Sequence, residues 1–69
     1  MPICFADPGT VYEITRLGGS SETRQHLADL GFHSGSQVTV VSKSGDDLIV
    51  HVKGGRIALG RNLSNKVYV

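Results

Sequence analysis

The sequence has one cysteine, no tryptophan and no long apolar run among its 69 residues. Because Cys4 has no second cysteine to pair with, the fold cannot depend on an internal disulfide, and we expect a reducing, cytoplasmic environment. Residues 1–10 lack the basic start and apolar stretch of a secretory signal, so we expect none. No segment approaches the roughly 18 consecutive apolar residues that a membrane helix requires, which argues against direct membrane insertion.

Neither sign of charge dominates the chain. Seven Lys and Arg side chains stand against six Asp and Glu side chains, which gives a formal net charge of +1. Nucleic-acid binding requires a basic stripe or patch, whereas here the acidic residues are interspersed among the basic ones. We therefore predict no nucleic-acid partner, and an RNA-binding small barrel is kept only as the third functional alternative.

Motifs that support catalysis or metal binding are also missing. The sequence has no serine nucleophile elbow, phosphate-binding loop or paired-carboxylate motif, and Asp46-Asp47 is expected to be a solvated turn. The candidate metal ligands show neither Cys-x-x-Cys nor His-x-x-x-His spacing. We predict a non-enzymatic protein without a cofactor or metal site, and a metal-binding or metal-sensing barrel with weak transition-metal affinity is the second alternative. The candidate ligands are Cys4, His26, His33 and His51.

What the sequence does contain is a set of short alternating apolar segments and one early helix. At this length we expect one domain, residues 1–69, whose small core supplies no more than about 3–5 kcal/mol of net stability. Closing a sheet on itself removes exposed edges, so the pattern predicts a mainly β small barrel of about five strands, with one short helix between the first and second strands. The pattern alone does not separate an SH3-like barrel from an OB-like one.

The end of the predicted helix, residues 21–30, carries the strongest local signal. Leu27 and Leu30 lie three residues apart and share one helix face. Gly31 follows where a helix commonly ends in a left-handed conformation, and Phe32 is then placed to pack back on Leu27. Ser20 or Ser21 is expected to cap the start of this helix. A second glycine, Gly35, allows a tight turn before the next strand.

Two hairpins are expected after the helix. Polar residues 43–47 predict a hairpin loop, and Gly54-Gly55 predicts a two-residue turn with positive φ at both positions. Alternation along the flanking strands assigns one face to the core. The inward positions are expected to be Val38, Val40, Leu48, Val50, Val52, Ile57 and Leu59.

The two ends of the chain complete the predicted barrel. Phe5 is expected to anchor an N-terminal segment over the barrel end. Along residues 11–17 we expect Tyr12 and Ile14 to point inward, with a bulge or strand end before Leu17. Residues 61–65 predict a short turn before a last strand at 67–69.

The order of these residues resembles the FeoA family, small SH3-like proteins of bacterial ferrous-iron uptake. Pro8-Gly9 precedes the first strand, and a terminal Val67-Tyr68-Val69 closes the chain, both in family order. The resemblance covers residues 8–69 and implies an SH3-like barrel. The residues that carry it between these two ends are Arg24, Leu27, Leu30-Gly31-Phe32, Gly35, Val38 and Ile57-Ala58-Leu59-Gly60-Arg61.

The resemblance also implies a function. It implies a cytoplasmic, non-enzymatic accessory of ferrous iron uptake that docks on the FeoB transporter, a membrane protein with a GTP-hydrolysing domain, or on that G domain, and modulates transport. From expected exposure and motif neighbourhood, we predict that Arg24, Phe32 and His33 at the helix end and Arg61 near the final turn bind the partner. The expected structural motif consists of Leu27, Leu30, Gly31, Gly35 and Gly60.

Overall fold

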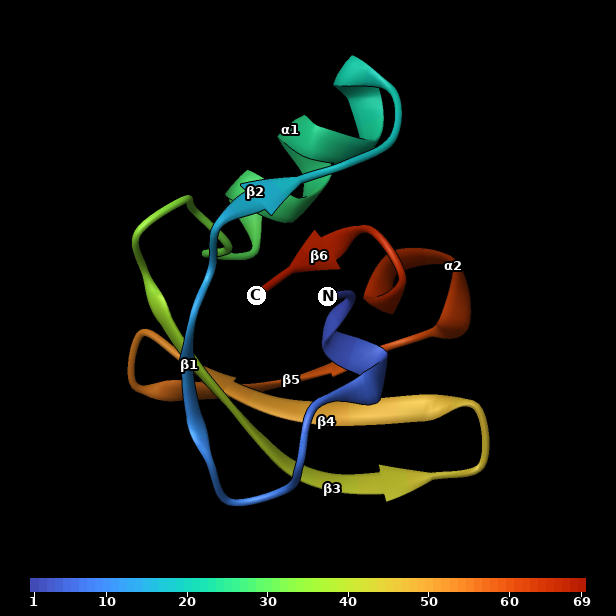
Figure 1. Cartoon of the computed structure of the whole chain (residues 1–69). Helices are drawn as coiled ribbons and strands as arrows, with labels where there is room; N and C mark the ends of the chain where they lie inside the picture. Colours follow the sequence, from blue (N-terminus) through green and yellow to red (C-terminus); the bar gives the residue numbers. More distant parts are fainter.

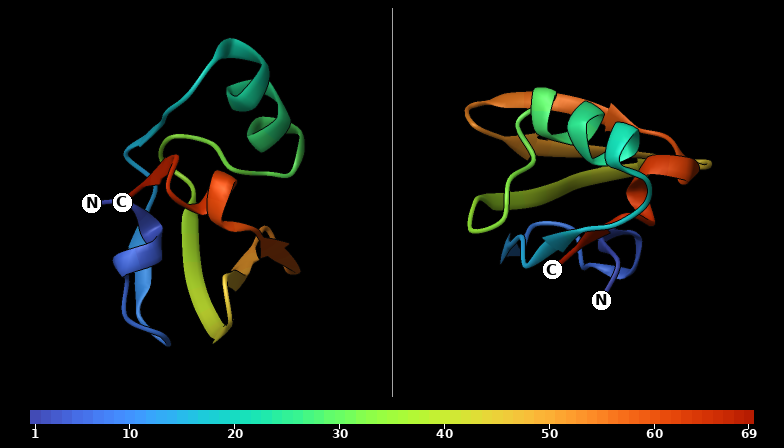
Figure 2. Two further views of the ribbon diagram at one scale, coloured as in Figure 1. Left: turned by 90° about the vertical axis from the view of Figure 1, so that its right-hand side faces the viewer. Right: turned by 90° about the horizontal axis from the view of Figure 1, so that it is seen from above.

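The computed structural model describes residues 1–69, and its strands form two antiparallel sheets (Figures 1 and 2). The larger sheet has the strand order β1-β3-β4-β5, and the smaller pairs β2 with β6. The expected mainly β fold is confirmed, with six strands. None of the helices is long and apolar enough to cross a membrane. In chain order the elements are η1 (Ile3–Phe5), β1 (Val11–Glu13), β2 (Arg16–Leu17), α1 (Ser21–Asp29), β3 (Gln37–Ser44), β4 (Asp47–Val52), β5 (Gly55–Leu59), α2 (Arg61–Ser64) and β6 (Val67–Tyr68).

The expected first strand divides into β1 and β2, which belong to different sheets. At the division, Ile14 is fully buried, and its N–H donates to the Ser36 carbonyl at 2.8 Å. The next N–H, from Thr15, donates to the Tyr68 carbonyl at 2.8 Å instead. The chain therefore leaves β3 and joins β6 between two neighbouring residues. This strand end before Leu17 accounts for apolar side chains at both even and odd positions of the segment.

The core fills the space between the sheets and the helix α1. As expected, the alternate residues of β3 and β4 point into it, and Leu59 does so from β5. Tyr12, Leu30 and Ile57 are only half-buried and pack against its margin. The fully or nearly buried apolar residues are Ile3, Ala6, Ile14, Leu27, Phe32, Val38, Val40, Leu48, Val50, Val52, Leu59 and Val67.

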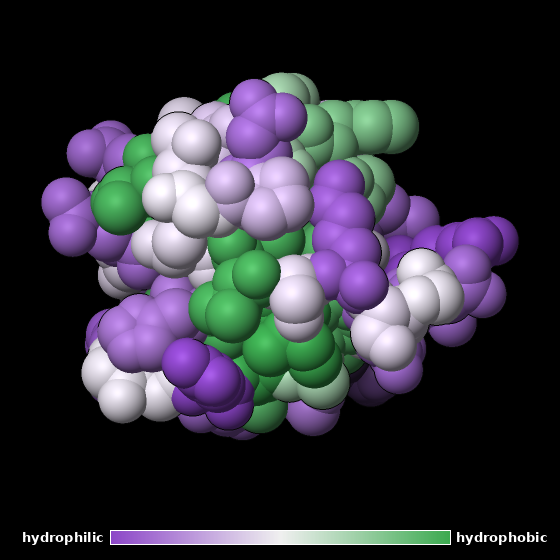
Figure 3. All heavy atoms as spheres, turned by 90° about the horizontal axis from the view of Figure 1, so that it is seen from below, coloured by the Kyte–Doolittle hydropathy of each residue, from purple (hydrophilic) through white to green (hydrophobic).

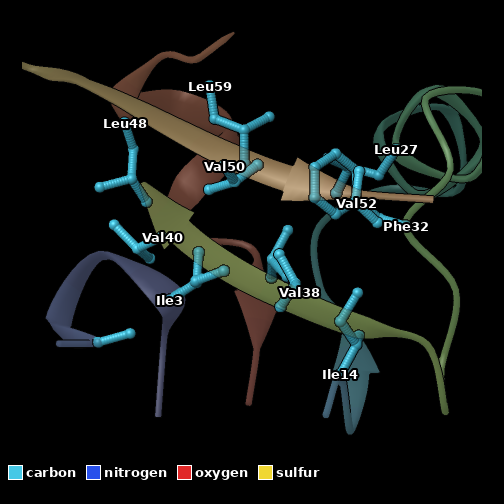
Figure 4. Close-up of a cluster of buried hydrophobic side chains, with 12 residues drawn as sticks. Ile3, Ile14, Leu27, Phe32, Val38, Val40, Leu48, Val50, Val52 and Leu59 are labelled. Carbon is cyan, nitrogen blue, oxygen red and sulfur yellow. The ribbon is translucent and has the colours of Figure 1, made fainter. Parts of the chain in front are cut away.

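The C-terminus of α1 has the predicted closed geometry. Gly31 has φ +106°, and its N–H donates to the Ala28 carbonyl at 3.0 Å. The Phe32 N–H donates to the Leu27 carbonyl at 3.0 Å, so two terminal carbonyls of the helix are satisfied in a Schellman arrangement. Figure 4 shows the side chains of Leu27, Phe32 and Val52 directed toward one another. The helix end is thereby attached to β4.

At the start of α1, the cap is Ser20. Its hydroxyl oxygen accepts a hydrogen bond from the Thr23 N–H at 3.2 Å, which satisfies one of the free amide donors of the first turn. Glu22 lies in this first turn, where a negative charge stabilises the helix by its interaction with the helix dipole. Of the two serines that the sequence allowed, the earlier one is therefore the cap.

Two predicted loops are corrected by the strand register. The loop expected at residues 43–47 is shorter, because Ser44 pairs with Asp47 and leaves a turn at Gly45-Asp46. The turn between β4 and β5 is centred on Lys53-Gly54, with φ +49° and +77°, and Gly55 already pairs with Val52. The expected Gly54-Gly55 turn would have placed Lys53 opposite Arg56. Like charges directly opposite each other destabilise a strand pair, which favours the observed register.

The N-terminal segment is anchored by residues other than Phe5, so that expectation was wrong. Ile3 and Ala6 are 0% and 1% exposed, whereas Phe5 is 70% exposed. The cause is the 3₁₀ geometry of η1, which has three residues per turn and places positions i and i+3 on the same side. Ile3 and Ala6 therefore face the core together, and Phe5 projects outward.

The segment expected as a turn at residues 61–65 contains the short helix α2, which begins after Gly60. The smaller sheet then closes the molecule. Arg16 stacks on the ring of Tyr68, with its guanidinium carbon 4.1 Å from the ring centroid. The two ends of the chain also lie side by side (Figure 1), because Met1 and Val69 exchange backbone hydrogen bonds.

We predict that Gly31→Ala destabilises the protein by about 1–2 kcal/mol, because an L-residue at positive φ is strained. An added Cβ would meet the Lys53 side chain at 3.5 Å and the Val52 side chain at 4.0 Å, which are ordinary van der Waals distances, so the cost is one of backbone conformation. For a domain of this size the loss corresponds to a melting temperature lower by roughly 4–16 °C. Thermal and urea unfolding measure it.

The matched control is Gly55→Ala, because Gly55 has no positive φ and an added Cβ would meet nothing nearer than 4.0 Å. Its effect should stay within about 0.5 kcal/mol. Equal stability of the two variants would contradict the prediction, because it would show that an alanine at the positive φ of position 31 is not strained.

Candidate functional site

An open hollow of about 390 Å³ lies between η1, the β3–β4 turn and α2. Leu48 from β4 lies in its wall, and Pro2 precedes η1 at its edge. The chain segments that surround it are far apart in sequence and are brought together by the closure of the barrel. The residues that give it chemical character are Cys4, Phe5, Lys43, Asp46, Asp47, Arg61, Ser64 and Asn65.

Phe5 supplies an exposed aromatic ring beside this hollow. It is the most exposed of the large apolar side chains, ahead of Val11 at 59%. The neighbouring thiol of Cys4 is free, and that residue is half-buried. A single exposed apolar side chain is common at protein surfaces, so the position of this ring beside a concavity is what makes it a candidate for binding. The ring is held outward by η1, so it is available without unfolding any element.

Charged groups also line the hollow. Arg61, the first residue of α2, forms an ion pair with Asp46 in the β3–β4 turn. Their side chains are 72% and 70% exposed, so the pair contributes at most about 1 kcal/mol. The ammonium of Lys43 donates to the Cys4 carbonyl at 3.3 Å. Because the stabilisation that these contacts supply is small, both cations can be re-paired with groups on a partner at little cost.

Lys43 reaches the hollow because of a bulge in β3. The register between β3 and β4 shifts between Val40 and Ser42, so the intervening Val41 is the extra residue. After the bulge, Lys43 pairs with Leu48, whose side chain lies on the core side of the sheet. The bulge thus re-aims a lysine toward the end of the barrel.

The predicted partner-binding residues do not form one surface. Phe32 is 0% exposed, so the expectation that it lies at the surface was wrong. Its backbone N–H closes the helix end on Leu27, and the same geometry buries its ring between α1 and β4. An exposed role for this ring would require opening the core.

Arg24, His33 and Arg61 are exposed, as expected, but they lie on separate parts of the molecule. Arg24 donates to the Gly19 carbonyl at 2.9 Å, before the start of α1. His33 lies in the loop that precedes β3, whereas Arg61 contacts Asp46 just beyond the end of β3. Eight strand residues span about 25 Å, and Figures 1 and 2 place the two segments at opposite ends of the sheet.

Of the predicted motif residues, Gly31 and Gly35 have positive φ, at +106° and +91°. Gly60 has φ −72° and serves instead as the residue before α2. The structure contains no group of three or more His, Cys, Asp or Glu side chains that could hold a metal ion. The four candidate ligands are divided among η1, α1, the loop before β3 and β4.

Sequence reasoning missed Phe5 and Lys43 as members of one surface. The spacing of Ile3 and Ala6 was the available signal for Phe5, because two inward residues three apart leave the residue between them outward in a 3₁₀ turn. The contact between Arg61 and Asp46 had no local signal, since the two residues are separated by 15 positions.

Comparisons with known proteins place the chain in a family. The family model described as the FeoA domain matches residues 1–69. A protein of Methanocaldococcus jannaschii, provisionally named Fe(2+) transport protein A, is 29% identical over 68 residues, which cover 99% of this chain and 83% of that protein.

Solved structures give the same assignment. The crystal structure of an iron uptake regulatory protein, FeoA, has a TM-score of 0.88 and 26% identity, covering 97% of this chain and 91% of that chain. The FeoA of Stenotrophomonas maltophilia, complexed with zinc, has a TM-score of 0.78 and 26% identity, covering 91% and 81%. That protein is described as a prokaryotic SH3 domain protein and suggested as an activating factor of ferrous iron transport. The expected SH3-like class of barrel is thereby confirmed, and the chain belongs to the FeoA family of ferrous iron transport proteins.

Proposed function

We propose that this FeoA-family protein works in the cytoplasm by docking on a cytoplasmic region of a FeoB-like transporter, or on its G domain. The observation that carries the proposal is the match of the FeoA domain to the whole chain, residues 1–69. Family members are accessory proteins of ferrous iron transport and are not a known enzyme family. An accessory without chemistry of its own acts by binding, so its effect on transport depends on an interaction surface.

The proposed centre of that surface is the hollow beside Phe5. Apolar and aromatic anchors near the centre of an interface dominate its energy, while charged groups at the rim mainly tune association rate and salt dependence. Phe5 has the properties of such an anchor, because it is 70% exposed and held by a short helix. Arg61 and Lys43 lie at its rim.

Arg24 and His33 are proposed as a second contact region, separate from the hollow, because they lie on other parts of the molecule. A standard interface buries about 800 Å² on each partner. This protein has a total accessible surface of 4005 Å², so such a footprint would cover about a fifth of it. A footprint of this size centred on Phe5 does not reach His33 at the opposite end of the sheet, so contacts at Arg24 and His33 require a second region of the partner. Peripheral, solvent-exposed contacts are expected to contribute less than the anchor.

The proposed mechanism is a shift between transporter states. A ligand moves an equilibrium between two conformations only by the difference in its affinity for them. The protein would therefore modulate transport by binding one nucleotide state of the transporter more tightly than the other. A tenfold preference corresponds to about 1.4 kcal/mol, which one well-placed anchor can supply.

The test is a binding measurement between the purified protein and a FeoB-like transporter in its nucleotide-free, GDP and GTP-analogue states. Phe5→Ala should weaken binding by about 30-fold, the equivalent of a hot spot of 2 kcal/mol. Arg61→Glu should weaken it less, and Arg24→Glu and His33→Ala less still. Because Phe5 lies outside the core, its removal should leave the melting temperature nearly unchanged.

The matched control is Val11→Ala, which removes another exposed apolar side chain on β1, away from the hollow. It should bind like the parent protein. The proposal fails if the parent protein binds no nucleotide state of the transporter, or if Phe5→Ala and Val11→Ala behave alike. Affinity for RNA that falls steeply with salt would favour the third alternative, because counterion release produces such a slope.

Metal binding is the second candidate function, favoured by one finding, the zinc complex of the S. maltophilia relative. In this chain the ligands lie on separate elements, so we predict weak binding of Zn²⁺ or Fe²⁺ and little change in stability. A ligand stabilises the folded state by an amount that depends on the ratio of its concentration to its dissociation constant. Calorimetric titration and melts with and without chelator measure it. A tight one-to-one site that is lost in His33→Ala or His51→Ala would favour the metal-binding function instead.

A further inference from the structure

The strand β5 is an edge of the larger sheet, with β4 as its one neighbour. The two-residue turn at Lys53-Gly54 makes Val52 and Gly55 a hydrogen-bonded pair. Hydrogen-bonded pairs alternate along an antiparallel ladder, so Ile57 also exchanges bonds with β4, whereas the residues on either side of it do not. The backbone N–H and C=O groups of Arg56 and Ala58 therefore point away from the sheet.

The same alternation can be checked on the other side of the sheet. It directs the backbone groups of Val40 away from β4 and toward β1, and the Gly9 N–H does donate to the Val40 carbonyl at 2.8 Å. None of the backbone hydrogen bonds outside the helices and ladders involves Arg56 or Ala58. Both residues are exposed. Two donors and two acceptors thus stand free along β5.

This edge has few of the features that usually prevent strands from pairing with other chains. It has no proline, no bulge and no inward-pointing charge, and its one charged side chain is Arg56 on the outer face. The sequence of β5 is Gly-Arg-Ile-Ala-Leu, and its register with β4 runs without a shift over all five residues. Ile57, which points to the core side, is only half-buried. An open, regular edge of this kind can accept one more strand.

We propose that β5 pairs with β5 of a second copy of this chain, antiparallel and centred on Ile57. In this register Arg56 lies opposite Ala58 of the second copy, and Ala58 opposite its Arg56. All four free backbone groups on each edge then find partners. The arrangement is isologous, so it closes as a two-fold dimer with one continuous sheet and does not propagate.

The side chains suit this register. Ile57 meets Ile57 of the second copy in a non-hydrogen-bonded pair, where side chains approach most closely. No like charges oppose each other, whereas a register centred on Arg56 would face two guanidinium groups. The formal net charge of +1 also gives little repulsion between copies.

The outer face of the sheet offers a second contribution. Figure 3 shows apolar side chains gathered on the face seen from below, bordered by hydrophilic ones. Ala58 and Ile49 are cross-strand neighbours, and alternation places both on the outer face. In the dimer the aliphatic stem of Arg56 from the second copy would lie over Ala58 while its guanidinium stays in water. A small residue at position 58 leaves room for this contact.

The test measures the monomer–dimer equilibrium by analytical ultracentrifugation from micromolar to millimolar protein. The parent protein should dimerise reversibly with concentration. Ala58→Pro should abolish the dimer and leave the fold intact, because it removes an N–H that the β4 ladder does not use and proline is tolerated at an edge. Ala58→Ser, which keeps the N–H, should still dimerise.

Two charge variants test the register without relying on proline. Ala58→Glu faces Arg56 of the second copy and should tighten the dimer, whereas Ala58→Lys should weaken it. Each cross-strand pair contributes roughly 0.2–1 kcal/mol and occurs twice, so each variant should change the dissociation constant by about 2-fold to 30-fold. The inference is overturned if the parent protein stays monomeric at millimolar concentration, if Ala58→Pro dimerises like the parent, or if Glu and Lys shift the equilibrium in the same direction.

Discussion

The contact between Phe32 and Leu27 at the C-terminus of α1 is the one on which the rest of the structure depends. The chain changes direction there, because Gly31 is left-handed and two backbone hydrogen bonds hold the turn, and Phe32 therefore packs on Leu27. This contact attaches the helix to β4 and starts the chain toward β3 in a fixed direction. A nine-residue helix is marginal in isolation, so packing at its end is what holds it.

The same contact determines where binding surfaces can form. It removes the Phe32 ring from the surface, and it leaves the opposite end of the barrel, beside Phe5 and Arg61, as the place where an aromatic side chain is exposed next to a hollow. The β5 edge is a separate surface, because it consists of backbone groups and one half-buried isoleucine. A dimer formed through β5 and a transporter bound beside Phe5 would use different elements. An experiment that contradicts one of these two interactions therefore leaves the other untouched.

Features that depend on neighbouring residues could be predicted from the sequence, whereas features that depend on contacts between distant segments could not. Gly31 and Phe32 follow Leu27 closely enough for the helix end to be predicted. The turn at Lys53-Gly54 depends on which charges meet across two strands, and the hollow depends on the approach of η1, the β3–β4 turn and α2, which are far apart in the sequence. The exposure of Phe5 does not follow from an apolar cluster alone, because it depends on a 3₁₀ turn that has two inward positions, Ile3 and Ala6.

Native-state amide hydrogen exchange tests the central claim most directly, because it reports the free energy of opening at each backbone N–H. If the helix end is part of the cooperative core, the Phe32 amide should open with a free energy close to that of the Val50 and Ile57 amides in the β4–β5 ladder. Protection of Phe32 no greater than that of the exposed first turn of α1 would contradict the account, since it would show that the helix end opens independently of the barrel.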